Sequence, residues 1–274
     1  MSFMRELHQL MVDYRFSPNQ KLGQNFVVEE SLVGKILATA APEKNDVILE
    51  IGAGTGFLTR ELLDKCRVVA VEKDETLARL LKEKFSGKNF RLIEGDFLTE
   101  KIPRVSKIVS LPPYYASSEI MLRIFRLEFK TAVLVFQKEF AEKLVAEPGF
   151  REYGFLSVLS RLSFRPAIVG PGVSPNNFYP KPESFSSIVR LERKKSFAPE
   201  ELENLEFFVK NLFRFRNKNV LNAAKSCAAD FSGKFGKSRG EILGALQGEK
   251  LAEEKVYLLE PEHFLELFRK IFRG

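Results

Sequence analysis

Short apolar runs alternate with amphipathic stretches over the first half of the chain. The runs are rich in Val, Ile and Leu, which is typical of strands that are buried on both faces. They lie at 46–51, 67–72, 90–94, 107–110 and 132–136. Helical periodicity predicts helices at 31–40, 57–65 and 74–85. This alternation predicts an α/β fold with a mostly parallel sheet covered by helices on both faces.

The pattern changes in the last third of the chain. Residues 166–191 are typical of hairpin or edge strands. Helical periodicity then predominates and no strand-like run remains, with helices expected at 199–216, 220–230 and 262–273. We therefore expect an α/β domain over residues 1–195 and a small all-α domain over residues 196–274.

The composition is that of a globular protein, because 45% of the 274 residues are hydrophobic and 29% are charged. Two cysteines are too few for a disulfide framework. Together with the two histidines they show no metal-ligand spacing, so no metal site is expected. No apolar run approaches the ~18 residues of a membrane helix. We expect a cytoplasmic monomer without a membrane partner.

A glycine-rich turn follows the first predicted strand, in the sequence Glu50-Ile51-Gly52-Ala53-Gly54-Thr55-Gly56. Glycines let the backbone turn sharply and approach a ligand closely. The spacing matches neither the G-x-G-x-x-G of dinucleotide-binding folds nor an ATP P-loop. An acid before G-x-G-x-G, with Glu72 ending the next strand, resembles motifs I and II of the Rossmann-like S-adenosylmethionine (SAM)-dependent methyltransferases.

This resemblance implies a site for SAM at the carboxyl ends of the strands. Glu72 would accept hydrogen bonds from the ribose hydroxyl groups of SAM. Asp96, which follows the third predicted strand, would accept one from the adenine amino group. Lys73 and Phe97, next to these two acids in the chain, are expected to complete this part of the site.

Further segments resemble the KsgA-type ribosomal RNA adenine dimethyltransferases, in the same order over nearly the whole chain. They are KLGQNF at 21–26, VLVFQKEFAEKL at 133–144, YGFLS at 153–157, FYPKP at 178–182 and FRFRNK at 213–218. In turn, these resemble the family's KLGQxF, LMxQxEFAxRL, YGRLS, FxPxPKV and FxxRxK motifs. The related Erm enzymes of 23S rRNA share the short C-terminal domain, but the motifs favour the KsgA type.

The family resemblance also implies roles for individual residues. Gln24 and Asn25 would lie near the amino-acid end of SAM, together with Gly52 and Gly54. Phe178 would sit against the target adenine. Its loop, with two asparagines before it and Tyr-Pro-Lys-Pro after it, favours an exposed platform over a core position.

One position departs from the family pattern. Enzymes of this class that methylate exocyclic amines carry [NDS]-[LIP]-P-[YFW] after the fourth strand, and the KsgA type usually has N-L-P-Y. In the ungapped alignment Leu111 stands at the Asn position, where it would contact both the target base and the cofactor. Pro113-Tyr114 then match the Pro-Tyr of the motif. A leucine side chain cannot accept a hydrogen bond from adenine N6. The Pro112 carbonyl could accept one, Tyr114 could stack on the base, and Ser110 or water could replace the missing acceptor.

The positive charge is concentrated in one segment. Lys and Arg exceed Asp and Glu by 7 overall, and residues 207–239 contain eight basic residues and one acid. If the helices here are roughly continuous, Lys210, Arg214, Lys218 and Lys225 share one side, with Arg216 nearby. Such a stripe suits contacts with RNA phosphates.

The resemblance implies SAM-dependent N6,N6-dimethylation of two adjacent adenosines near the 3′ end of small-subunit (16S) rRNA, within a pre-30S particle, and a role in ribosome biogenesis. Two alternatives remain open. Because of Leu111, the protein could be a catalytically weakened, SAM-binding assembly factor. It could also be an Erm-like enzyme of large-subunit rRNA.

Overall fold

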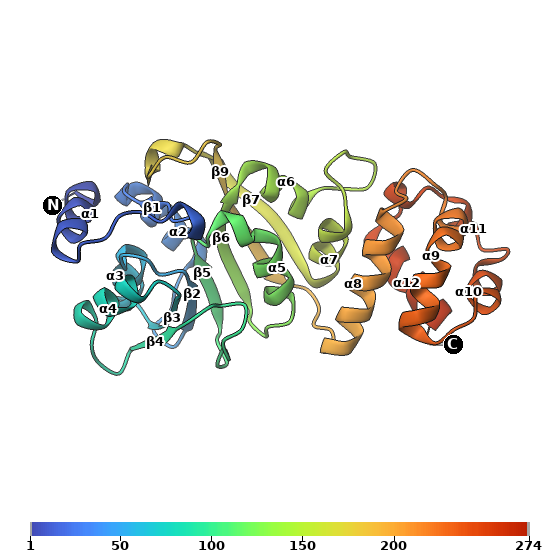
Figure 1. Cartoon of the computed structure of the whole chain (residues 1–274), viewed down its shortest axis with the longest axis horizontal. Coiled ribbons are helices and arrows are strands. Elements are labelled where there is room, and N and C mark those ends of the chain that lie inside the picture. Colours follow the sequence, from blue (N-terminus) through green and yellow to red (C-terminus); the bar gives the residue numbers. More distant parts are fainter. Residues whose placement is uncertain (1, 273–274) are drawn as a thin grey trace. The chain divides into compact units, whose positions relative to one another are not determined.

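The computed structural model describes residues 2–272 and divides into two compact units (Figure 1). The first unit comprises Met1–Ala141 and Arg165–Arg193, and the second comprises Glu142–Phe164 and Lys194–Gly274. The chain thus passes into the helical unit twice. Its last crossing falls within two residues of the boundary expected at 195. Segment 142–164 differs from expectation, because it belongs to the helical unit and not to the α/β unit.

Within the described residues, a seven-stranded sheet forms the centre of the first unit, in the order β4-β3-β2-β5-β6-β9-β7. Its members are β2 (Val47–Ile51), β3 (Arg67–Glu72), β4 (Phe90–Glu94), β5 (Lys107–Ser110), β6 (Thr131–Gln137), β7 (Phe164–Val173) and β9 (Ser186–Arg193). Strands β2 to β6 pair in parallel, and β9 runs antiparallel to β6. The α/β fold expected from the sequence is therefore confirmed.

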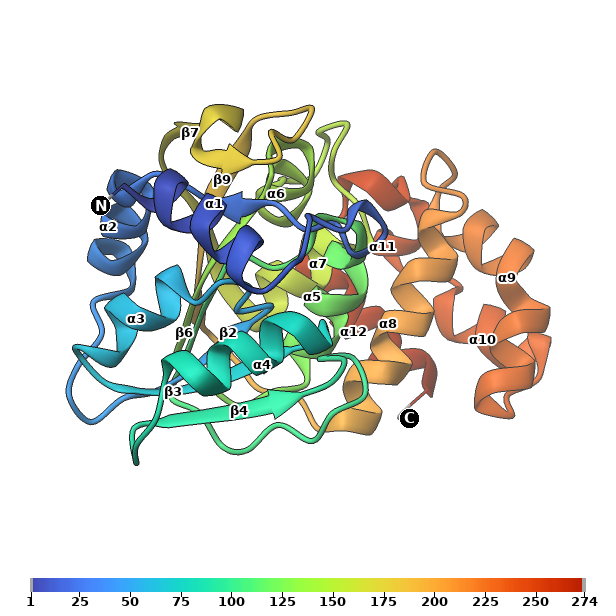
Figure 2. The same cartoon turned by 60° about the vertical axis from the view of Figure 1, so that its left-hand side comes forward.

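Helices cover the sheet, which explains why its strands are apolar on both faces. Helices α3 (Phe57–Leu63) and α4 (Glu75–Lys84) pack against β3 and β4, while α2 (Glu30–Ala40) packs against β5, β6 and β9 (Figure 2). The sequence predicted all three. The remaining helices of this unit are α1 (Phe3–Asp13), α5 (Ser117–Phe125) and the first half of α6 (Lys138–Val145).

A short ribbon brings two distant segments together. Strand β1 (Phe26–Val27) pairs antiparallel with β8 (Phe178–Tyr179), with Val27 opposite Phe178. The KLGQNF segment therefore lies beside the FYPKP segment, although some 150 residues separate them. Both segments end up at the same edge of the first unit.

The second unit consists of helices packed around phenylalanine rings. They are α7 (Phe155–Ser163), α8 (Pro199–Phe213), α9 (Val220–Phe235), α10 (Arg239–Leu246), α11 (Lys250–Glu253) and α12 (Pro261–Phe272). Phe208 contacts Phe231 and Phe268 at ring-centroid distances of 5.4 and 5.8 Å. The helices expected at 199–216, 220–230 and 262–273 are present, although Arg273 lies outside the described residues. None of the helices described is both long and apolar enough to cross a bilayer.

Candidate active site

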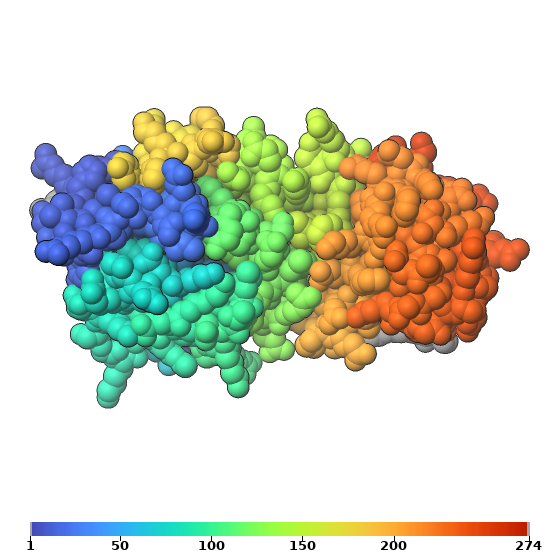
Figure 3. All heavy atoms as spheres, in the orientation of Figure 1, coloured from blue at the N-terminus to red at the C-terminus, as the bar shows by residue number. Residues whose placement is uncertain are grey.

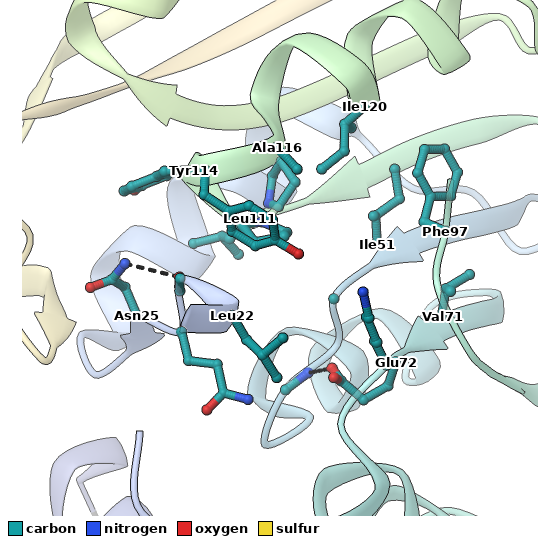
Figure 4. Close-up of a pocket in the computed structure, with 18 of the residues that line it drawn as sticks. Leu22, Asn25, Ile51, Val71, Glu72, Phe97, Leu111, Tyr114, Ala116 and Ile120 are labelled. Atoms are coloured by element: carbon teal, nitrogen blue, oxygen red, sulfur yellow. Dashed lines mark hydrogen bonds between the residues drawn. The ribbon is translucent and has the colours of Figure 1, made fainter. Parts of the chain in front are cut away.

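A pocket opens in the first unit at the carboxyl ends of the parallel strands (Figure 4). The empty space of the pocket, counted together with its open mouth, is about 850 Å³. Every residue that the sequence assigned to the cofactor or the target base lines it. These are Gln24, Asn25, Gly52, Gly54, Glu72, Lys73, Asp96, Phe97, Leu111, Pro112, Tyr114 and Phe178.

The glycine-rich turn is held by the carboxylate that ends β3. Gly54 donates its backbone N–H to one oxygen of Glu72 at 2.8 Å, and Asp74 donates to the other at 2.9 Å. Gly54 has φ +58°, and a Cβ added there would lie 3.3 Å from the ring of Phe26. Burial raises the pKa of Glu72 against the opposing effect of these N–H donors. The turn therefore requires glycine both for its conformation and for the space above it.

Glu50, the acid that begins the motif, lies beneath the turn and does not line the pocket. The hydroxyl group of Thr59 donates to its carboxyl group at 2.6 Å, which joins β2 to α3. Burial raises its pKa to about 8, and the nearby charge of Glu72 adds to the effect. Glu50 is therefore protonated at neutral pH and supports the turn from below.

Asp96 and Lys73 form an ion pair at 2.8 Å on the rim of the pocket. Leu98 donates its backbone N–H to the second oxygen of Asp96 at 2.8 Å. Burial alone would raise the pKa of Asp96, but Lys73 and this N–H hold it below its ordinary value. Asp96 is thus an ionised acceptor at the end of β4.

The loop before β1 is anchored to the start of α4. The side chain of Gln24 donates to Asp74 at 3.0 Å and accepts from the backbone of Asn19 at 2.8 Å. Asn25 donates its side-chain amide to the carbonyl of Gly23 at 3.1 Å. One donor and one acceptor of the Gln24 amide thus bond protein partners, and these two bonds position the loop.

Ser110 is fully buried and its hydroxyl group is committed to the neighbouring strand. It donates to the carbonyl of Ile51 at 2.6 Å and accepts from the N–H of the same residue at 3.1 Å. Ser110 is also absent from the pocket wall. These bonds argue against Ser110 as a substitute for the missing asparagine.

The segment after β5 presents unpaired acceptors. Leu111 and Pro112 line the pocket, and within residues 2–272 neither of their carbonyl oxygens accepts a hydrogen bond. Leu111 packs its half-buried side chain against the hydrophobic core of the unit. Backbone carbonyls, and not side chains, are therefore the available acceptors at this point of the wall.

Tyr114 and Phe178 form an aromatic corner of the pocket. The hydroxyl group of Tyr114 lies 2.8 Å from that of Ser186, and its ring meets Phe178 edge to face at 6.4 Å. Burial raises the pKa of Tyr114 to about 12, so it remains a neutral phenol. Figure 4 shows Tyr114 and Leu111 on one side of the pocket and Glu72 on the other.

The expectation that Phe178 is an exposed platform is wrong. Only 1% of its surface is exposed, and it belongs to the hydrophobic core of the first unit. The reason is its pairing in β8 with Val27 of β1, which the local loop sequence does not reveal. Phe178 nonetheless lines the pocket, so it can reach a ligand only from the pocket interior.

The predicted basic stripe is interrupted in the second unit. Helix α8 ends at Phe213 and α9 begins at Val220, so the helices are not continuous. Arg214 pairs with Asp230 at 2.8 Å. Arg216 donates to the backbone carbonyls of residues 150 and 151. Lys218 bonds the hydroxyl group of Ser226 at 3.0 Å, while Lys210 lies over the ring of Phe155 at 5.7 Å and Lys225 is exposed.

Comparison with known proteins decides the family. A family model described as ribosomal RNA adenine dimethylase matches residues 15–259. The chain belongs to the ribosomal RNA adenine dimethylase family. The prediction of an rRNA adenine dimethyltransferase is thereby confirmed at the level of the family, whose members use SAM.

Curated relatives cover nearly the whole chain. A probable ribosomal RNA small subunit methyltransferase A of Thermococcus gammatolerans is 35% identical over 262 residues, covering 95% of this chain and 92% of the relative. A protein of the same description from Pyrococcus furiosus is 34% identical over 263 residues, covering 96% and 95%.

Solved structures of other rRNA-modifying enzymes share the fold. A dimethyladenosine transferase from Plasmodium falciparum has a TM-score of 0.74 and 25% identity, covering 88% of this chain and 95% of that one. The 23S rRNA methyltransferase ErmE has a TM-score of 0.64 and 30% identity, covering 90% and 99%. The Rossmann-like methyltransferase fold is thereby confirmed.

The sequence assigned no site role to several other pocket residues. Ile51, Val71 and Ile120 provide apolar wall, and Tyr115, 57% exposed, lies at the pocket and against Gly23. Apolar residues at strand ends look like ordinary core residues in a sequence. Tyr115 carried a weak signal, because it directly follows the matched Pro-Tyr pair.

Proposed function

We propose that this protein dimethylates N6 of two adjacent adenosines near the 3′ end of small-subunit rRNA, within a pre-ribosomal particle and as part of ribosome biogenesis. One observation carries the proposal. The glycine-rich turn, Glu72, Asp96 and the segment 111–114 line a single pocket in a chain of the adenine dimethylase family. The small-subunit assignment is supported by the descriptions of the curated relatives.

The pocket fits SAM. Two carboxylates stand at the ends of successive strands, and a Cβ at Gly54 would fill the close approach that the turn leaves open. Glu72 would bind the ribose, Asp96 the adenine amino group, and Gly52 and Asn25 would lie at the amino-acid end, with Ile51, Val71 and Phe97 as apolar wall. SAM supplies a methyl group on a positively charged sulfur.

The other part of the pocket would hold the target base. Adenine N6 is a weak nucleophile because its lone pair is delocalised into the ring. Acceptors fixed in advance at its N–H bonds oppose this delocalisation and orient the amine. The free carbonyls of Leu111 and Pro112 would serve as these acceptors, with Tyr114 against the base from one side. The base must be unstacked to enter.

A decisive test is methyl transfer from labelled SAM to unmethylated small and large ribosomal subunits, separately. We expect N6,N6-dimethyladenosine, identified by mass spectrometry after nuclease digestion, in small-subunit rRNA alone. Label in large-subunit rRNA would instead assign the protein to Erm-like chemistry. Tight particle binding without any transfer would contradict the enzymatic proposal.

Leu111 favours a second candidate, a SAM-binding assembly factor with slow turnover. Its hydrocarbon side chain lines the pocket where an amide would be expected. In that case the protein would bind small subunits tightly, while single-turnover transfer would be slower than particle release. Measuring both rates on the same particles separates the two candidates.

A further inference from the structure

An exposed phenylalanine lies at the tip of the connection between α6 and α7. Phe150 is 61% exposed, and its neighbour Arg151 is also exposed. This yellow-green segment projects from the surface in Figure 3. A single exposed apolar residue is unremarkable by itself. The surroundings of Phe150 are what set it apart.

The loop that carries Phe150 is fixed at four points within the second unit. Gly149 donates its N–H to the carbonyl of Tyr257 at 2.8 Å, and the buried hydroxyl group of Tyr153 donates to the carbonyl of Leu259 at 2.8 Å. Arg216 donates one N–H to the carbonyl of residue 151 at 2.8 Å and another to that of Phe150 at 3.2 Å. The backbone that carries the ring of Phe150 is therefore already restrained. Binding a ligand there would cost less conformational entropy than binding to a flexible loop.

The role of Arg216 changes accordingly. Its guanidinium group bonds two backbone carbonyls and lies over the ring of Tyr257 at 5.6 Å. This arrangement makes Arg216 a positioning residue for the loop. Arg216 thus orients the segment that carries an exposed aromatic ring.

A basic hollow lies along the same strip of backbone. It is lined by Lys218, Asn219, Asn222, Lys225, Ser226, Glu253 and Lys255. Segment 216–218 runs beside segment 255–257, because Val256 donates to the carbonyl of Lys218 at 3.1 Å and Tyr257 to that of Arg216 at 3.2 Å. Among the residues described, neither Lys225 nor Lys255 forms an ion pair. Three lysines face one acid in this hollow.

We propose that Phe150 and this lysine hollow together bind an unpaired nucleotide stretch of RNA. A base stacks on the ring of Phe150, and a neighbouring phosphate enters the hollow between Lys218, Lys225 and Lys255. The inference rests on the RNA substrate proposed above and adds a docking point in the helical unit. Charge complementarity selects a polyanion, and the aromatic ring selects one with exposed bases.

The test uses the full-length protein and two fluorescein-labelled probes, a single-stranded oligoadenylate of 12 nucleotides and its duplex with oligouridylate. Binding is followed by fluorescence anisotropy. We expect Phe150→Ala to weaken single-strand binding about 5- to 150-fold, the range of a lost base–aromatic stack, and to leave duplex binding nearly unchanged. Phe150→Tyr should retain the affinity.

The lysines give an independent readout. A plot of log affinity against log salt concentration has a negative slope. Lys225→Ala and Lys255→Ala should each make this slope shallower by ~0.7 per lost phosphate contact. Lys237→Ala, outside the hollow, is the matched control and should change it less. Equal slopes for all three variants would overturn the phosphate half of the inference.

Further outcomes separate this inference from other occupants and from the proposed function. If Phe150→Leu binds single strands as well as the wild type, bases do not stack on the ring. Phe150 would then serve as an apolar contact for another protein, and the inference would be overturned. Undetectable single-strand binding by the wild type also overturns the inference. Methyl transfer is measured separately at saturating particle concentration, so an inactive protein that still shows the Phe150 dependence would refute the proposed activity and not this site.

Discussion

Leu111→Asn tests the chemistry of the pocket directly. The substitution places a side-chain acceptor at a position that lines the pocket, beside the free carbonyls of the same segment. Loss of one preorganised hydrogen-bonding group typically costs ~10²–10³ in kcat. If the amine of the target base lies here, we expect the single-turnover rate of methyl transfer to rise toward that factor.

The cost in stability can be estimated from the packing of Leu111. Its side chain is half-buried against the core, and full burial of a leucine contributes ~1.5–3 kcal/mol. Replacing it with a polar side chain should therefore lower the free energy of unfolding by about 1 kcal/mol, or ~2–4 °C in Tm. The variant stays folded, so the rate can be read without ambiguity.

Rates are measured with excess enzyme, labelled SAM and unmethylated small subunits, with thermal unfolding of each variant alongside. Leu111→Met is the matched control, because it changes the shape of the side chain without adding an acceptor. It should leave the rate within a few-fold of the wild type. A folded Leu111→Asn variant with an unchanged or slower rate would refute the reasoning, because position 111 would then not face the amine.

Three further predictions follow from the geometry. Ser110→Ala should lower the free energy of unfolding by ~1–3 kcal/mol, because the buried backbone N–H and carbonyl of Ile51 lose their partner. The kcat of the folded variant should stay within a few-fold of the wild type. A much larger loss of kcat would show that Ser110 is an acceptor for the target base. The pKa of Glu50 rises from 4.5 to about 8 on folding, so only the unfolded state releases this proton between those values. The free energy of unfolding should therefore fall as pH rises through this window, by at most about 5 kcal/mol, and denaturation of Glu50→Gln should show a flatter profile. Gly54→Ala should weaken SAM binding, measured by calorimetry, at least ~10-fold, because Gly54 has a positive φ and lies close to the ring of Phe26. The control is Gly34→Ala in α2, where the space around the added methyl group is open. This variant should bind SAM normally and gain ~0.5–1 kcal/mol of stability.

The central sheet could be predicted because its signal is local. A strand buried on both faces is mostly apolar, so the runs at 46–51 and 67–72 identified β2 (Val47–Ile51) and β3 (Arg67–Glu72) almost to the residue. The start of α4 is likewise set by a local contact, since the side chain of Asp74 accepts hydrogen bonds from the N–H groups two and three residues later. Helix α1 was not anticipated, although Phe3 and Leu7 repeat at helical spacing and are buried. Its short apolar face carries little signal without the surface it covers.

The site residues were identifiable for a different reason. Carboxyl ends of parallel strands share one edge of a sheet, so acids after successive strands had to converge, and Glu72 and Asp96 line one pocket. The sequence placed Phe178 at the pocket but did not predict that it is buried. Its burial comes from pairing with Val27, a residue some 150 positions away. Non-local pairing of this kind leaves no periodicity in the loop itself.

In the basic segment, residues 207–239, the number of positive charges does not predict which side chains are available to contact RNA. Arg214 and Arg216 contribute equally to the positive excess of residues 207–239, yet one is paired with Asp230 and the other holds a backbone loop. A guanidinium group has five N–H donors in a rigid fork, so it is well suited to clamp carbonyls, whereas a lysine ammonium on a flexible stem follows a phosphate more easily. We therefore expect Lys225 and Lys255 to contribute more to the salt dependence of RNA binding than either arginine. Only one of these two lysines lies in the segment that the charge count selected, because the hollow is closed by a part of the chain that returns about 30 residues later.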